Sequence, residues 1–333
     1  MFVSTLSTLR EIKLDLNTDL NHDFCVTDKN LNKAIIKTLA FFNIFDYPLT
    51  DWEIYKYLWV KDLNKKKYNY GEIKNALNNI YSIEQREGFY FLQGKSDLVA
   101  TRKQRQIISK KKYQRALWII KVLSLLPFTK MIAVCNTLAY DNVRDDSDID
   151  LFIVTAKNKI WTTRFYVATL LKILHLRPTA ENKKNKICLN FFITRDNLNL
   201  QPLMIEDDVY FTYWFKQVLP VYNDKIFSKL MTENIVIKNN INNEELPGFF
   251  NKRKVRQGIM AQGFKSMLEV INSWEWLEKL LKFIQMKVMP RVLLDKVGQG
   301  SGVVINDQVL KFHVDDKREE FREEWKQVVS SKL

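Results

Sequence analysis

The stretch of residues 146–151, Asp-Ser-Asp-Ile-Asp-Leu, most strongly constrains the fold of this chain. It leads directly into the apolar run 151–154, which is typical of a buried strand. Because residues two apart on a strand project to the same face, we expect the carboxylates of Asp148 and Asp150 to lie side by side, with their apolar neighbours buried behind them. Paired oxygen ligands at this spacing suit Mg²⁺ or Mn²⁺, so the sequence predicts that these two aspartates form a metal site.

Apolar segments on both sides of this stretch predict a sheet with a covering helix. Strands are expected over 131–135, 151–154 and 187–193, and a helix over 160–175. The order strand, turn, strand, helix, strand indicates an α+β core, which we assign to residues 128–240. The chain of 333 residues contains only 9 glycines and 7 prolines, which favours a helix-rich protein with few long loops.

Residues 31–100 predict a separate N-terminal domain. Helical periodicity begins at 31, a second helix follows the capping-box pair Thr50 and Glu53, and a third is expected over about 70–83. Three short helices followed by a hairpin resemble a winged helix-turn-helix, whose third helix enters the major groove of DNA. A domain that only docks other proteins is the alternative. The exposed side of the third helix would offer four polar side chains to DNA or RNA: Lys74, Asn75, Asn78 and Asn79.

The helix expected over 101–127 carries a block of positive charge that links the two domains. The formal net charge of the whole chain is +14, which favours polyanionic partners. We therefore expect the block 102–115 to contact phosphates of nucleic acid, and a lysine-rich composition without functional meaning is the alternative. The block has no acidic residue and contains Arg102, Lys103, Arg105, Lys110, Lys111, Lys112 and Arg115.

The two ends of the chain carry weaker patterns. Residues 1–30 form an N-terminal extension without clear periodicity, and an Asn-rich loop over 238–245 predicts a domain boundary. Residues 250–333 are expected to form a helical C-terminal region, with an amphipathic helix around 274–281 that either docks on the core or lies on a membrane surface. Because no window approaches the roughly 18 apolar residues that a spanning helix needs, we expect no membrane span.

Three cysteines, Cys25, Cys135 and Cys188, lie far apart in the sequence and show no pairing pattern. Such spacing fits a reducing compartment and argues against a zinc site. We therefore expect a cytoplasmic protein.

Residues 136–151, Asn-Thr-Leu-Ala-Tyr-Asp-Asn-Val-Arg-Asp-Asp-Ser-Asp-Ile-Asp-Leu, resemble the signature of the DNA polymerase β-like nucleotidyltransferase superfamily. That signature is Gly-Ser after a strand, followed about a dozen residues later by Asp-x-Asp. Asn136 and Thr137 stand at the Gly-Ser positions, and the aspartate pair follows without a gap. The resemblance covers about 128–195 and is separate from the winged-helix resemblance.

The resemblance implies a nucleotidyltransferase that uses Mg²⁺ to move a nucleoside monophosphate from an NTP substrate to a hydroxyl acceptor. The acceptor would belong to a nucleic acid, a protein or a small molecule. Asn136, Thr137 and Ser147 would bind the nucleotide, while Asp148 and Asp150 would hold the metal at the catalytic centre.

Two positions depart from the family pattern. Asn136 replaces glycine, although Asn tolerates the left-handed backbone better than most residues. The family often places a third catalytic carboxylate on a later strand, and the residue expected there is Asn190. Because an amide cannot accept a proton, Glu181 or Asp196 would have to substitute for it. The alternative to an enzyme is a catalytically degenerate nucleotidyltransferase fold that serves as a nucleic-acid-binding, protein-binding or regulatory module.

Overall fold

The computed structural model describes residues 28–61, 66–179, 181–223, 225–242 and 254–333. It shows an α+β protein with one three-stranded and one six-stranded sheet, which confirms the predicted fold class at that level. Most of the extension expected over 1–30, and part of the boundary expected over 238–245, lie outside the described residues.

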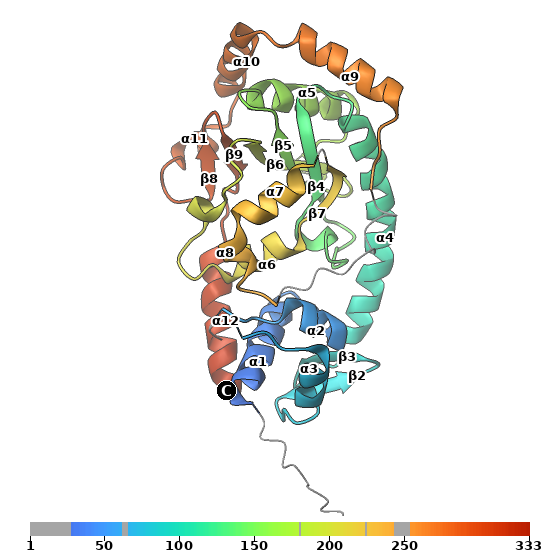
Figure 1. Ribbon diagram of the computed structural model, residues 1–333, viewed down its shortest axis with the longest axis vertical. Coiled ribbons are helices and arrows are strands. Elements are labelled where there is room, and N and C mark those ends of the chain that lie inside the picture. The colour runs from blue at the N-terminus through green and yellow to red at the C-terminus, as the bar shows by residue number, and fades with distance from the viewer. Residues whose placement is uncertain (1–27, 62–65, 180, 224, 243–253) are drawn as a thin grey trace, which may run out of the picture.

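The three-stranded sheet and three helices form one end of the molecule (Figure 1). The predicted capping box is confirmed, since the Thr50 hydroxyl accepts from the Glu53 N–H and the Glu53 carboxylate accepts from the Thr50 N–H. The third helix ends at Leu77, earlier than expected, because the Asn79 N–H turns back to the Ala76 oxygen. The elements are α1 (Lys29–Ile44), β1 (Leu49–Thr50), α2 (Asp51–Tyr57), α3 (Tyr70–Leu77), β2 (Ile83–Arg86) and β3 (Phe89–Leu92).

The six-stranded sheet has the order β7-β4-β5-β6-β9-β8. β5 and β6 run parallel, and each other neighbouring pair is antiparallel. The three strands predicted from the sequence are confirmed as β4, β5 and β6. The strands are β4 (Thr129–Val134), β5 (Ile149–Thr155), β6 (Ile187–Thr194), β7 (Leu219–Asn223), β8 (Val303–Ile305) and β9 (Val309–Phe312).

The expectation that residues 250–333 are helical is incomplete, because β8 and β9 belong to this region. Each is only three or four residues long, too short for a clear alternating pattern. β9 pairs with β6 through Phe191 and Lys311, so the C-terminal region completes the sheet that contains the aspartate pair. Such a pairing depends on a contact between segments far apart in the sequence.

Helices cover both faces of this sheet. The buried residues of α4 (Leu98–Leu123) and α5 (Ile160–Ile173) pack on one face. The other face is covered by α6 (Val209–Gln217), α7 (Ile226–Glu233) and α8 (Ile235–Lys238). The C-terminal helix α12 (Arg318–Lys332) packs against both α6 and α1, where the Trp325 Nε1–H donates to the Lys37 oxygen. It thereby joins the N-terminal helices to the sheet.

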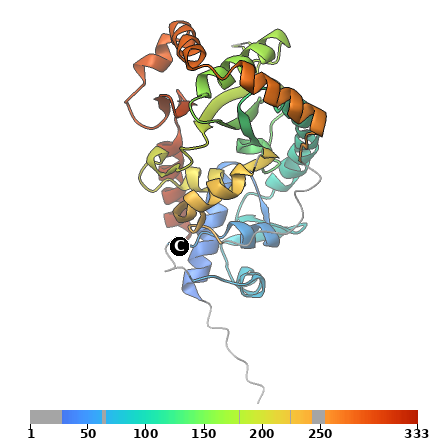
Figure 2. The same cartoon turned by 45° about the horizontal axis from the view of Figure 1, so that its top comes forward.

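Three further helices form an arm, in which α9 and α10 lie at the end of the molecule opposite α1 and α11 lies beside β8 (Figures 1 and 2). They are α9 (Ile259–Ile271), α10 (Glu275–Lys287) and α11 (Arg291–Asp295). α10 packs along α5. Among the described residues, no helix is both long enough and apolar enough to cross a membrane.

Candidate metal and nucleotide site

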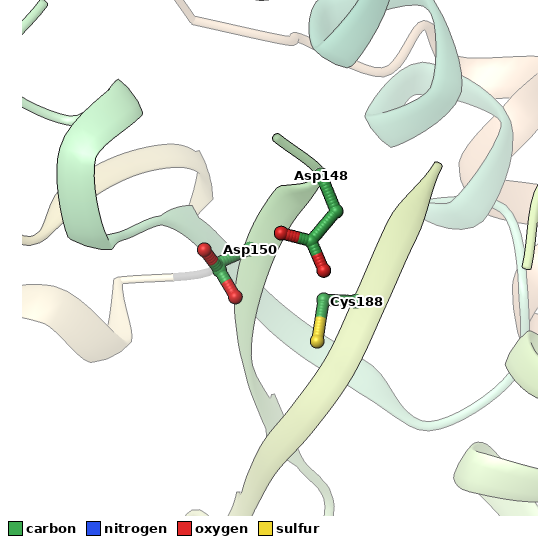
Figure 3. A group of neighbouring side chains, drawn as sticks. All are labelled: Asp148, Asp150 and Cys188. Carbon is green, nitrogen blue, oxygen red and sulfur yellow. The ribbon is translucent and has the colours of Figure 1, made fainter. Parts of the chain in front are cut away.

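The side chains of Asp148, Asp150 and Cys188 lie close together at the start of β5 and β6 (Figure 3). Their ligand atoms all lie within 4.8 Å of one another. The strand pairing explains this arrangement, because Asp150 on β5 stands directly beside Cys188 on β6. Ile149 and Leu151 are buried, as the alternation along the strand predicts. The cluster could hold a metal ion.

Burial and the neighbouring Asp148 carboxylate raise the pKa of Asp150 to about 7. Side-chain hydrogen bonds from Asn136 and Cys188 to the Asp150 carboxylate oppose this rise. Burial and the two carboxylates raise the pKa of the Cys188 thiol, which is therefore neutral and donates its S–H to Asp150. Two close carboxylates in a partly buried site are a setting in which a divalent cation relieves like-charge repulsion.

The donor set combines hard and soft ligands. The oxygens of Asp148 and Asp150 suit Mg²⁺ or Mn²⁺, and the Cys188 sulfur would favour a softer ion such as Zn²⁺ if it lost its proton. Because the Cys188 pKa is raised, the carboxylates are the stronger ligands in this site. The residues present therefore fit a divalent cation held by the aspartate pair.

The sequence analysis missed Cys188, since the cysteines lie far apart in the chain. In the sheet, Cys135 and Cys188 stand on opposite sides of Asp150, and the Cys135 N–H donates to the backbone oxygen of Asp150. Neither Glu181 nor Asp196 belongs to the cluster, so the structure does not bring either expected substitute to the described site. Cys188 could have been identified from the pairing register of β5 and β6, which places it beside Asp150.

Asn136 and Asn190 line a cavity of about 350 Å³ beside the cluster. Asn136 begins a short 3₁₀ helix, η1 (Asn136–Leu138), and has a φ of 54°, the left-handed conformation in which glycine is the usual residue. Its side chain bonds to Asp150 and thus connects the cavity with the carboxylates. The remaining walls come from β6, α6, the end of β9 and the start of α12, and include Phe191, Tyr210, Phe211, Trp214, Lys311, His313 and Phe321.

The two other residues expected to bind nucleotide have different surroundings. Thr137 lies within η1, and its backbone oxygen accepts from the Asn142 N–H at 2.8 Å. The Ser147 hydroxyl donates to the Arg144 oxygen at 2.9 Å, and the Ser147 oxygen accepts from Lys112 Nζ at 2.5 Å. Ser147 therefore holds the loop that leads into Asp148.

Most basic side chains of the block 102–115 form contacts with other residues of the chain. Arg102 forms a 2.7 Å ion pair with Glu53, and its guanidinium lies 3.5 Å from the centre of the Tyr47 ring. Because Arg102, Lys103 and Arg105 form ion pairs, the block offers less uncompensated charge for phosphate contact than the sequence suggested. Four other members have partners: Lys103 with Glu87, Arg105 with Asn142, Lys112 with the loop at 145–147, and Arg115 with the Asn185 oxygen.

Comparison of the chain with protein-family models, with curated proteins and with solved structures found no match in any of the three.

Proposed function

We propose that this protein is a divalent-metal-dependent nucleotidyltransferase that moves a nucleoside monophosphate from an NTP to a hydroxyl acceptor and releases pyrophosphate. One observation carries the proposal: Asp148 and Asp150 lie close together at a strand end, and Asn136, which bonds to Asp150, lines a cavity. The left-handed Asn136 supports the resemblance of residues 136–151 to the DNA polymerase β-like superfamily, because the family has glycine there. The core over 128–195 and the N-terminal elements α1 to β3 would then be a nucleotidyltransferase core and a winged helix.

Each residue of the site has a distinct role in this proposal. Asp148 and Asp150 hold Mg²⁺ or Mn²⁺, which neutralises phosphate charge and polarises phosphoryl oxygens when bound. Asn136 fixes Asp150 through its side-chain hydrogen bond. Thr137 follows Asn136 in the same turn and would supply a hydroxyl to the triphosphate, and Ser147 keeps the loop before Asp148 in place.

The cavity beside the pair suits a nucleotide. Its volume of about 350 Å³ lies within the range of small-ligand sites. The rings of Tyr210 and Phe321 lie stacked with centroids 5.3 Å apart and form an aromatic wall against which a base can pack. Lys311 and His313 line the same cavity and supply polar groups.

An assay with labelled ATP, CTP, GTP and UTP tests the proposal. Since the metal supplies several kcal/mol of transition-state stabilisation, Asp148→Asn should lower the transfer rate by at least about 100-fold. Asp146→Asn is the matched control, because Asp146 is exposed and lies outside the cluster. Unchanged transfer in Asp148→Asn would contradict the proposal.

A second candidate is a catalytically degenerate fold that binds nucleotide without turnover. Asn190 favours it, because this residue stands where the family often has a carboxylate and no third carboxylate joins the described cluster. Equilibrium binding of ATP with Mn²⁺, without transfer to RNA, DNA or protein, would support this alternative. Cys188→Asp places a third carboxylate beside the pair, so a gain of transfer in this variant would identify the missing group.

The acceptor is a separate question. Lys74, Asn75, Asn78 and Asn79 are exposed on α3 and the turn after it, as a winged helix that presents DNA or RNA requires. Binding of RNA or DNA that weakens steeply with salt would support a nucleic-acid acceptor. Binding that does not change with salt would exclude a phosphate-dominated contact.

A further inference from the structure

Helix α9 faces the rest of the protein with its polar side. Lys265 is buried and donates to the Tyr222 hydroxyl at 3.0 Å. Glu269 Oε1 accepts from the Phe128 N–H at 2.8 Å, and Asn272, which follows the helix, accepts from the Tyr166 hydroxyl at 2.6 Å. An amphipathic helix on a globular protein normally buries its apolar side, so α9 is inverted.

Helix α10 is anchored in a similar way. The Glu278 carboxylate accepts from the Trp161 and Thr162 N–H groups at 2.8 and 2.9 Å. Gln285 donates to the Trp161 oxygen at 2.8 Å. Lys159 donates to three backbone oxygens of the loop between the two helices, at residues 272–274. Polar contacts thus hold α9 and part of α10 in place. α10, α11 and the residues between them also pack Leu281, Met286, Met289, Leu293 and Leu294 toward the protein.

The apolar side chains of the arm point into solvent. Of the 23 exposed large hydrophobic residues in the described chain, 13 lie within residues 259–292. The exposed fraction reaches 91% for Met260. Concentration of apolar side chains on one surface marks an interaction site, whereas scattered ones do not. The 13 residues are Ile259, Met260, Phe264, Met267, Val270, Ile271, Trp274, Trp276, Leu280, Phe283, Ile284, Val288 and Val292.

The charges around this surface favour an anionic partner. Residues 254–296 expose two acidic side chains, Glu275 and Asp295, against six basic ones. A second copy of the chain, with its own formal net charge of +14, would bring like charges together. The six basic residues are Lys254, Arg256, Lys279, Lys287, Arg291 and Lys296.

The position of the arm suits a flat partner. α9 and α10 form the end of the long axis opposite α1 and α12, so a surface can approach them without meeting the N-terminal helices (Figures 1 and 2). Trp274 and Trp276 are both exposed at the bend between the two helices. Tryptophan is enriched at the level of lipid headgroups, where one part of its ring is apolar and another is wet.

We propose that the α9–α11 arm binds the surface of an anionic lipid bilayer. The apolar side chains, among them Phe264, Met267 and Phe283, enter the boundary between headgroups and acyl chains, and the surrounding lysines and arginines contact anionic headgroups. The contact is peripheral, and the polar sides of α9 and α10 remain on the protein. The arm would attach the protein to a membrane surface without a spanning helix. The Asp148–Asp150 cluster lies at the other end of β5, on the side of the sheet edge away from the arm.

Flotation of the full chain with lipid vesicles tests the proposal. Vesicles of phosphatidylcholine with phosphatidylglycerol should carry the protein, and pure phosphatidylcholine should carry much less. The double variant Phe264→Gln/Phe283→Gln should weaken binding by about tenfold or more. Tyr81→Gln, which changes an exposed aromatic residue between α3 and β2, is the matched control and should bind normally.

A second pair of changes measures the electrostatic part. Lys279→Gln/Lys287→Gln should weaken binding by about fivefold for each lysine removed, the factor that corresponds to about 1 kcal/mol. All substituted side chains are exposed, so the melting temperature should stay close to that of the unchanged protein.

Three results would overturn the proposal. The first is the absence of flotation with anionic vesicles at low salt. The second is equal binding by the double phenylalanine variant. The third is self-association in sedimentation experiments that the phenylalanine variant abolishes while vesicles remain unbound, because the arm would then join two copies of the chain.

Discussion

At the start of β5, two carboxylates lie partly buried among apolar strands, whereas on α9 and α10 apolar side chains lie in solvent and polar ones such as Lys265 and Glu278 face the protein. Both regions depart from the usual distribution of polar and apolar residues, in opposite directions. Asp150 lies between buried Ile149 and Leu151, and Lys265 is buried next to exposed Phe264.

The contrast indicates what each region lacks. A partly buried carboxylate pair is unfavourable until a cation shares its charge, and an exposed apolar surface is unfavourable until another apolar phase covers it. In both regions the surrounding structure holds the unfavourable groups in place through specific contacts, such as Asn136 on Asp150 and Glu278 on the α5 N-terminus. Features of this kind are typical of binding sites.

The largest expected difference concerns two phenylalanines of equal size. Phe192 on β6 is fully buried, so Phe192→Ala should lower the free energy of unfolding by about 3–5 kcal/mol. Phe264 on α9 is half exposed, so Phe264→Ala should change it by less than about 0.5 kcal/mol. Urea denaturation of both variants measures the difference. A comparable loss in Phe264→Ala would mean that the arm packs on the protein through its apolar side.

The next largest effect on stability concerns the polar contacts that hold α9 on the protein. Lys265→Met leaves the Tyr222 hydroxyl and the Thr129 oxygen without their donor and should cost about 1–3 kcal/mol in the local stability of α9. Amide hydrogen exchange over residues 259–271 reports this local stability. Lys279→Met, at an exposed position of α10, is the control and should leave exchange unchanged. Slower amide exchange in Lys265→Met would show that the buried lysine weakens the packing of α9 on the protein.

The candidate metal site predicts a stability that depends on pH. The pKa of Asp150 is raised to about 7 in the folded protein, against about 3.9 in an unfolded chain. The folded state therefore binds more protons between these values, and the metal-free protein loses stability as pH rises through this window. Mn²⁺ binds the ionised pair, so its effect on the melting temperature should grow from pH 5 to pH 8.

At pH 8, Mn²⁺ should raise the melting temperature by at least about 2–4 °C. This is the shift that about 1 kcal/mol of added stability produces in a domain of 150–250 residues. Asp150→Asn should raise the melting temperature of the metal-free protein at pH 8 and abolish the response to Mn²⁺, while Asp146→Asn should keep it. If Mn²⁺ raised the melting temperature equally at pH 5 and pH 8, the ion would not bind through ionised Asp150.

The smallest effect concerns the turn at Asn136. Its φ of 54° suits asparagine or glycine, so Asn136→Ala should be about 1 kcal/mol less stable than Asn136→Gly. Both variants lose the hydrogen bond to Asp150, so the difference in their stability reports the cost of the left-handed backbone alone. Equal stability of the two in urea denaturation would show that the turn relaxes to another conformation.

Local patterns in the sequence determined the central elements. Alternation along 148–151 placed both aspartates on one face, and the Thr50 and Glu53 pair formed the expected capping box. The amphipathic helix around 274–281 was also predictable, because helix and strand periodicities depend on residues close in the chain. The sequence could state which residues share a face of α10 and left open which face is buried.

Only the tertiary structure decided how these elements meet. It placed Cys188 beside Asp150, brought β9 to β6, used Arg102 inside the protein and turned the apolar side of α9 outward. Each of these outcomes depends on pairing between segments far apart in the sequence, which local periodicity does not encode. The paired carboxylates could therefore be predicted from the sequence, whereas their third neighbour and the exposed arm could not.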